Sequence, residues 1–126
     1  MSYRTPLARA RGLGSAKEGA DHFWRQRVTA VANIFLVSFL IWLLATHIGA
    51  DHATVKRSLA RPQIAIPLLL LLLSGLMHMR LGMQTIIEDY VHSEGRKVAA
   101  LMLNSFFVFA VGLACIYAVL KLSFGA

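Results

Sequence analysis

Charged side chains are scarce in this sequence of 126 residues. Only 15% of the residues are Asp, Glu, Lys or Arg, whereas 57% are hydrophobic, and the mean hydropathy is +0.61. This balance disfavours a soluble enzyme, which needs a more polar surface, and excludes a disordered chain, which needs low hydrophobicity. The single cysteine, Cys115, excludes an internal disulfide and a cysteine zinc cluster. Phosphate-binding Gly-rich loops, metalloprotease helices, paired-carboxylate dyads and nucleophile elbows are also absent, so the sequence shows no complete catalytic constellation.

Three long uncharged stretches are present instead. They run from Val28 to Thr46, from Pro62 to Met79 with an apolar continuation to Ile87, and from Val98 to Leu120. Each has about 20 residues or more, which is the length of a helix that crosses a ~30 Å hydrocarbon layer. We therefore predict an all-α membrane protein with transmembrane helices over about 28–48, 63–89 and 98–122. Gly49 is expected to close the first helix, and Gly95 to separate the second from the third.

The basic residues indicate which way the chain crosses the membrane. Six of them lie in the polar N-terminal arm, residues 1–27, and two lie in the second loop, against three in the first loop and one in the C-terminal tail. The positive-inside rule then places the N-terminus in the cytoplasm. The C-terminus, which follows the anchor domain of residues 28–122, is expected on the outer side of the membrane. The net charge of +7 is thus attributed to lipid headgroups and topology, not to nucleic acid.

His78 is the most informative residue, because it lies deep in the second apolar run. An ionisable side chain at that depth indicates function, although a histidine hydrogen-bonded to a neighbouring helix is the alternative. On a helical wheel, His78 shares a face of roughly 80° with Gly75 and Gly82, which would leave a trough beside the imidazole or simply allow close helix packing. A flat macrocycle fits such a trough, and neutral imidazole is the usual axial ligand of haem iron. His47 lies at another depth, so a second axial ligand would come from another polypeptide.

Two further groups of residues lie toward the predicted inner side of the membrane. Asp89 and Tyr90 end the second helix about 18 Å from His78. They would form either a polar helix end in the aromatic belt or an acid and hydrogen-bond donor for a hydrophobic carrier. Arg27 enters the first helix at the hydrocarbon edge, where it would contact lipid phosphate or neutralise a buried carboxylate such as a haem propionate. Arg80 lies roughly 160° from His78 on the wheel and points away from its face.

The segment from His78 to His92, HMRLGMQTIIEDYVH, resembles the signature of the small hydrophobic membrane anchor subunit of succinate dehydrogenase, respiratory complex II. The shared pattern is a histidine, Gly-Met four residues later, and Asp-Tyr at eleven and twelve residues. The segments from Gly14 to Gly19 and from His22 to Ala30 are similar to alphaproteobacterial and mitochondrial-type members. The resemblance covers about residues 14–122, and the family's three-helix topology with the N-terminus inside agrees with the predicted orientation.

The resemblance implies specific roles for four residues. His78 falls on the haem b axial ligand, and the second ligand is given by a companion cytochrome b subunit, with which this chain forms half of a heterodimeric helical bundle. Tyr90 falls on the tyrosine that hydrogen-bonds a ubiquinone carbonyl, and Asp89 falls on its acidic neighbour. Arg27 falls on the arginine near the haem and quinone region. The other implied partners are the flavoprotein and iron–sulfur subunits, and the implied location is the bacterial inner membrane in preference to the mitochondrial one.

The activity implied by the resemblance is that of a subunit, not catalytic alone, of succinate:ubiquinone oxidoreductase. A fumarate reductase anchor working with menaquinol is the nearest alternative, because an anchor sequence does not fix the direction of electron flow. A small structural or accessory membrane protein, with His78 merely hydrogen-bonded between helices, is the alternative from another class. The chain departs from some distant members of the family at Arg80 and His22, so these two positions are given no role.

Overall fold

Three helices that are long and apolar enough to span a membrane dominate the structure, a computed structural model that describes residues 5–12 and 19–124. They are α2 (Gly19–Thr46), α4 (Pro62–Tyr90) and α5 (Glu94–Phe124). Their 28, 29 and 31 residues give lengths of about 42 to 47 Å at 1.5 Å per residue. Each helix therefore extends beyond a ~30 Å hydrocarbon layer. The described residues contain no strand, and the predicted all-α fold with three spans is confirmed.

The ends of the helices differ from the predicted ones in two places. α2 begins at Gly19, so residues 19–27, which we expected in the arm, are helical. Hydropathy detects only the part of a helix inside the hydrocarbon layer, and polar residues can continue that helix into the headgroup region. Gly95 does not separate two helices, because it lies near the start of α5, whose first backbone hydrogen bond is accepted by the Ser93 carbonyl at 2.8 Å. A serine followed by Glu94 favours a helix start there despite the glycine.

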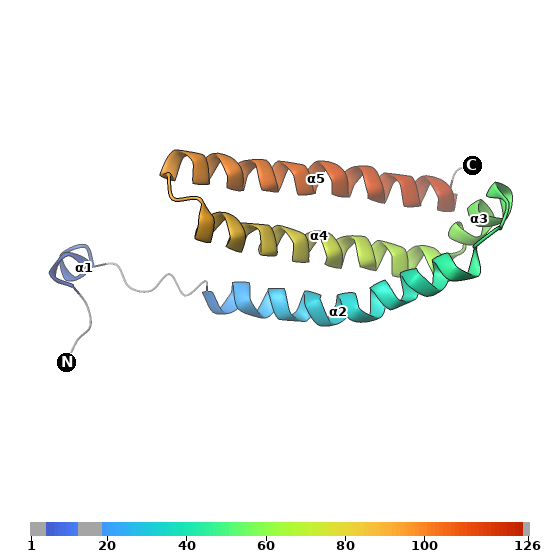
Figure 1. Cartoon of the computed structure of the whole chain (residues 1–126), viewed down its shortest axis with the longest axis horizontal. Helices are drawn as coiled ribbons and strands as arrows, with labels where there is room; N and C mark the ends of the chain where they lie inside the picture. The colour runs from blue at the N-terminus through green and yellow to red at the C-terminus, as the bar shows by residue number, and fades with distance from the viewer. Residues whose placement is uncertain (1–4, 13–18, 125–126) are drawn as a thin grey trace.

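The first loop begins as predicted and then forms a helix that was not predicted. Gly49 has a φ of +78°, in the left-handed region, in the turn that follows α2. His47 Nδ1 donates a hydrogen bond to Leu43 O at 2.8 Å, which satisfies one carbonyl of the last turn. The loop then forms α3 (His52–Leu59), which packs against α4 and α5 at the end of the bundle opposite the α4–α5 loop (Figure 1). The remaining short helix, α1 (Pro6–Ala10), lies in the N-terminal arm.

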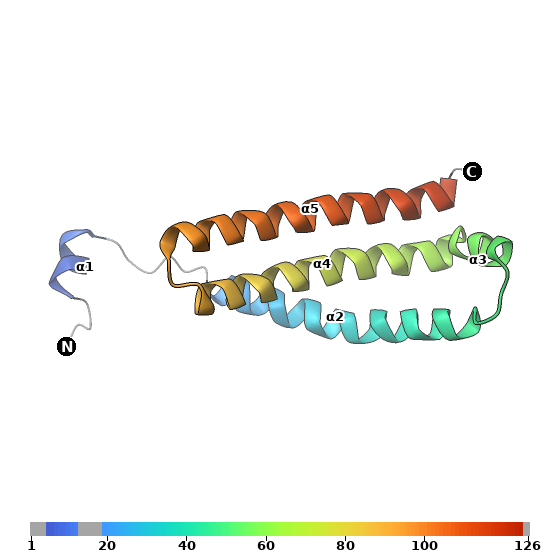
Figure 2. The same cartoon turned by 45° about the horizontal axis from the view of Figure 1, so that its top comes forward.

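α4 lies between α2 and α5 and packs against both, as Figures 1 and 2 show. α5 approaches α4 at Gly112, where a Cβ atom would lie 3.0 Å from Leu76 Cδ1. A small residue at such a point allows two membrane helices to come close together. In the described part of the chain, the buried apolar side chains are only those of Leu43, Ala65 and Ile87. Most of the apolar surface therefore faces outward, toward lipid or a partner.

Candidate functional site

A line of polar side chains runs along the interface between α2 and α4, in the half of the bundle that contains the α4–α5 loop. This polar seam consists of His22, Gln26, Thr29 and Asn33 of α2 and Ser74 and His78 of α4. The α2 members follow one another at intervals of four, three and four residues, which places them on one face of the helix. Toward the opposite end of α2 the interface is apolar, and Leu43 is only 4% exposed. α2 therefore presents a polar half and an apolar half to α4.

Thr29 and His78 make the central polar contact of the seam. Thr29 Oγ1 lies 3.1 Å from His78 Nδ1, and Thr29 is only 8% exposed. One turn earlier on α4, the Ser74 hydroxyl donates to Thr29 O at 3.4 Å. One turn later, a Cβ atom on Gly82 would lie 3.5 Å from Gln26 Nε2. Because earlier residues of α2 meet later residues of α4, the two helices run antiparallel, and α2 crosses α4 closely at the level of the histidine.

The surroundings of Thr29 favour one of the two assignments of the proton on His78. Thr29 Oγ1 has a single proton and lies 2.8 Å from Arg25 O and 3.1 Å from Gln26 O. When the nearest carbonyl takes that proton, as is common for a threonine inside a helix, the hydroxyl oxygen accepts the hydrogen bond from His78 Nδ1–H. The lone pair of the neutral ring is then on Nε2. This assignment gives His78 the tautomer that binds a metal ion through Nε2.

His78 Nε2 is free to bind a ligand. Within the described residues this nitrogen has no hydrogen-bond partner. It is also not among the polar atoms that are fully buried without a partner, so it is accessible from outside the chain. The same residues contain no group of three or more His, Cys, Asp or Glu side chains that could hold a bare metal ion. A single free imidazole nitrogen fits an iron ion whose other ligands come from a macrocycle and from a second polypeptide. The donor set of the chain is thus compatible with the haem that the sequence implied.

The trough predicted beside His78 is open on one side only. At Gly75 no described atom of another element lies within 4 Å of the position that a Cβ atom would take, so there is open space at this position. At Gly82 a Cβ atom would make an ordinary contact, 3.5 Å, with Gln26 Nε2 of α2. Of the two expectations for these glycines, Gly82 therefore fits close packing of α2 against α4, and Gly75 fits an open trough. A flat group beside His78 would lie toward Gly75.

Arg27 is not brought to His78 by this structure. It lies two residues from Thr29 and therefore roughly 160° away around α2. Its side chain is exposed, and its guanidinium carbon lies 5.1 Å from the centre of the Phe23 ring, in a cation–π contact. No hydrogen bond or ion pair joins Arg27 to the histidine in the ranges that the structure describes. A role for Arg27 toward a haem propionate stays a prediction.

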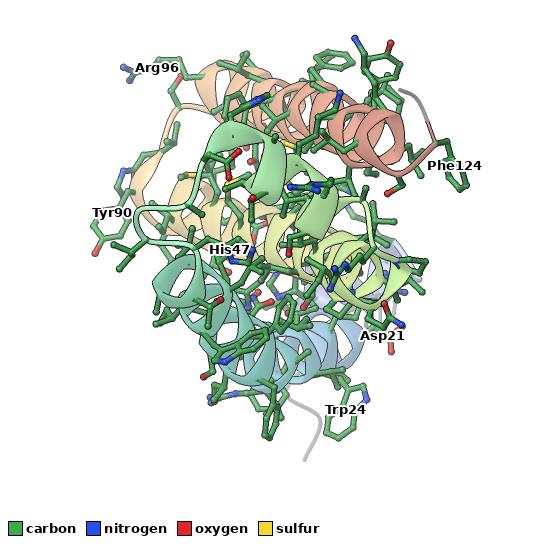
Figure 3. The ribbon with its side chains drawn as sticks, turned by 90° about the vertical axis from the view of Figure 1, so that its right-hand side faces the viewer. Asp21, Trp24, His47, Tyr90, Arg96 and Phe124 are labelled. Carbon is green, nitrogen blue, oxygen red and sulfur yellow. The ribbon has the colours of Figure 1, made fainter. Side chains whose placement is uncertain are left out.

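Tyr90 and Asp89 form a separate place at the end of α4. Both are exposed, Tyr90 by 76%, and Figure 3 shows the Tyr90 ring pointing away from the bundle. Together with His92 and Arg96, Tyr90 lines a hollow of about 330 Å³ beside the α4–α5 loop. Tyr90 lies about 18 Å from His78 along the helix. The two predicted sites are therefore separate regions of the same half of the bundle.

A larger hollow, of about 540 Å³, opens at the loop end of the polar seam. Its lining residues are Gly19, Asp21, His22, Arg25, Arg80, Leu81, Gln84 and Glu88. It brings together His22 and Arg80, the two positions that received no role from the sequence. Within the seam, His22 Nε2, Gln26 Oε1 and Asn33 Oδ1 are buried and have no hydrogen-bond partner among residues 5–12 and 19–124. Buried polar atoms are normally paired with protein or with ordered water, so the seam has the capacity to receive further polar groups.

Thr29 and Gln26 of α2, together with Ser74 of α4, are residues of this site that the sequence did not single out. Their signal was the spacing: His22, Gln26, Thr29 and Asn33 repeat at helical intervals on one side of an otherwise apolar helix. Polar residues on one face of a membrane helix indicate a neighbouring helix that they contact. The spacing could have indicated the face, although it could not have shown that the neighbour is His78.

The chain is similar to known membrane proteins along most of its length. The family described as Succinate dehydrogenase/Fumarate reductase transmembrane subunit matches residues 1–113. The Succinate dehydrogenase hydrophobic membrane anchor subunit of Paracoccus denitrificans is 35% identical over 126 residues, which cover 100% of this chain and 97% of that protein. The subunit of the same name from Rickettsia bellii (strain RML369-C) is 35% identical over 89 residues, 71% of each chain. The Succinate dehydrogenase membrane anchor subunit of Reclinomonas americana is 32% identical over 90 residues, 69% of this chain and 75% of that one. No solved structure gives a significant match.

Proposed function

Because the chain belongs to the family of succinate dehydrogenase and fumarate reductase transmembrane subunits, we propose that it anchors the flavoprotein and iron–sulfur subunits of a succinate dehydrogenase. It is an integral protein of the bacterial inner membrane, with three spanning helices. The names of its relatives refer to succinate dehydrogenase, which favours succinate oxidation over the fumarate reductase alternative. Membership in the family also excludes an unrelated structural membrane protein. The chain itself is a subunit without catalysis of its own.

The proposal assigns one axial ligand of haem b to His78 and the other to a companion cytochrome b subunit. The observation that carries it is the hydrogen bond between Thr29 Oγ1 and His78 Nδ1, which leaves Nε2 without a partner in the described chain. The position also fits, because His78 lies 12 residues before the end of α4 at Tyr90, within the part of the helix that lipid surrounds. Haem bound there would supply one-electron redox chemistry, while the chain would hold and orient the ring.

The proposal also assigns part of a ubiquinone site to Tyr90 and Asp89. Both side chains are exposed at the end of α4, and Tyr90 lines a hollow with His92 and Arg96. A phenol can donate a hydrogen bond to a quinone carbonyl, and a nearby carboxyl group can pass a proton to the reduced oxygen. Arg27, exposed on α2, would provide a positive charge for a haem propionate in the region of the haem and the quinone.

Replacing His78 tests the assignment of the haem ligand. We expect His78→Leu to lower or abolish the haem b content of the purified complex, measured from the reduced-minus-oxidised spectrum and divided by the flavin content. His52→Leu is the matched control, because His52 is exposed on α3 at the other end of the bundle. An unchanged haem spectrum in the His78 variant would refute the assignment. Dividing by flavin separates loss of haem from loss of the assembled complex.

A further inference from the structure

We propose that Thr29 is a positioning residue that prepares His78 for metal binding, an inference that rests on the proposed haem ligation. Thr29 would act through its hydroxyl oxygen, which accepts a hydrogen bond from Nδ1–H. This bond keeps the proton on Nδ1 and leaves Nε2 unprotonated and available. It would also fix the rotation of the imidazole about its side-chain bonds. Thr29 itself would not touch the cofactor. The role is a property of this chain alone, because both partners of the hydrogen bond belong to it.

The contact between Thr29 and His78 is partly buried between α2 and α4. An Nδ1–H group that loses its acceptor in the interior costs about 1–3 kcal/mol. A histidine without that acceptor would lower the cost by rotating or by moving its proton to Nε2, which would block coordination. Since Thr29 Oγ1 lies 3.1 Å from Nδ1, the chain makes the metal-binding tautomer the favoured one before any ligand arrives. Such preparation of a metal site is typical of a residue that holds a ligand in place.

Thr29 is itself held in a defined position, as a positioning residue must be. Its side chain is 8% exposed, and its hydroxyl lies 2.8 Å from Arg25 O in the preceding turn of α2. Its carbonyl accepts a hydrogen bond from the Ser74 hydroxyl of α4 at 3.4 Å. The hydroxyl oxygen thus points at His78 because both its own helix and the neighbouring helix fix it. A mobile surface hydroxyl could not fix a tautomer in this way.

The hydrogen bond has a consequence for the redox potential. Donation from Nδ1–H to an oxygen makes the imidazole a more basic ligand, and a more basic ligand stabilises ferric over ferrous iron. Loss of the bond should therefore raise the midpoint potential of the haem. Each tenfold preferential loss of ferric affinity corresponds to about 59 mV for a one-electron couple. A purely structural threonine would not shift the potential in a way that depends on the hydroxyl.

The experiment compares Thr29→Val, which keeps the shape and removes the hydroxyl, with Thr29→Ser, which keeps the hydroxyl. Both are made in the complete complex and compared with wild type and with His78→Leu. The measurements are haem b per flavin, haem retained after dilution in detergent, the midpoint potential, and the EPR signal of the ferric haem. We expect Thr29→Val to weaken haem retention by about 10- to 100-fold and to raise the potential. We expect Thr29→Ser to stay close to wild type in all four.

Two results would overturn the inference, and they are distinguishable from each other. If Thr29→Val matches wild type in haem retention, potential and EPR signal while His78→Leu loses its haem, the ligation stands and Thr29 has no positioning role. If His78→Leu keeps a full and unchanged haem, the ligation fails and the inference fails with it. Should Thr29→Val not assemble, Thr29→Ala carries the same expectation, and its difference from Thr29→Ser decides the question.

Discussion

Gly75 offers a direct test of where a planar cofactor lies against α4. It is one turn before His78, and no other side chain or element that the structure describes lies within 4 Å of the position that a Cβ atom would take there. On the other side of the histidine, at Gly82, a Cβ atom would already contact Gln26 Nε2 of α2 at 3.5 Å. If haem binds through His78 Nε2, its edge or face should pass over Gly75. In Gly75→Leu the new Cβ atom meets no described atom within 4 Å, and the rest of the side chain extends into the space beside the histidine.

The structure sets the size of the expected effect. Leucine is favoured over glycine within a helix by roughly 0.7–1 kcal/mol, so the substitution should not weaken α4 itself. Overfilling a packed site with a side chain of this size costs about 1–3 kcal/mol. At 1.4 kcal/mol for each factor of ten, the affinity for haem should fall about 5- to 140-fold. The substitution should therefore lower the affinity for haem without lowering the stability of the fold.

The assay is the haem b content per flavin of the purified complex, before and after dilution in detergent. Gly95→Leu is the matched control, because Gly95 also has nothing within 4 Å of its Cβ position but lies at the start of α5. We expect the control to keep its haem and Gly75→Leu to lose it. The reasoning is refuted if the Gly75 variant retains haem as firmly as the Gly95 variant does.

Three other experiments test the remaining features. Tyr90→Phe should lower quinone reduction about two- to tenfold through one lost hydrogen bond, while succinate oxidation with a soluble dye persists; equal loss of both contradicts the assignment. Gly112→Leu should force α5 away from α4 at a cost of about 1–3 kcal/mol and lower the temperature at which the complex inactivates, and an unchanged temperature contradicts the close packing. In a Cys115→Ser background, Thr54→Cys in α3 should react with an impermeant thiol reagent on intact cells, whereas Arg96→Cys should not. The opposite labelling pattern contradicts the predicted orientation.

The spanning helices were predictable because lipid imposes one rule on every residue that it surrounds. An uncharged run of about 20 residues has few alternatives to a helix, and all three runs form one. The ends were less predictable, because outside the hydrocarbon layer that rule no longer applies. α2 gains a polar stretch from Gly19, the loop forms α3, and Ser93 rather than Gly95 sets the start of α5. These features depend on hydrogen bonds and contacts that hydropathy does not report.

The sequence could point to the central histidine of the candidate site but not to the residues that pair with it. His78 could be identified because a histidine in the middle of an apolar run has no ordinary surface role. Its partner Thr29 is 49 positions away in the chain, and no local pattern connects the two. Gly82 illustrates the same limit. The helical wheel places it on the face of His78, but only the packing of α2 shows that Gln26 lies in contact with this position.

The polar seam of this chain is incomplete, and its incompleteness explains why such an anchor works inside a complex. His22 Nε2, Gln26 Oε1 and Asn33 Oδ1 are buried without a partner in the described part of the chain, and each such atom costs about 1–3 kcal/mol. Water entering from the hollow at the loop end, or a polar group from a companion subunit, would remove that cost. His78 Nε2 is open in the same seam. A cofactor held between two subunits stabilises the pair, because it binds the assembled state and not the separate chains. The proposed ligation would therefore contribute to holding the anchor in its complex as well as to electron transfer.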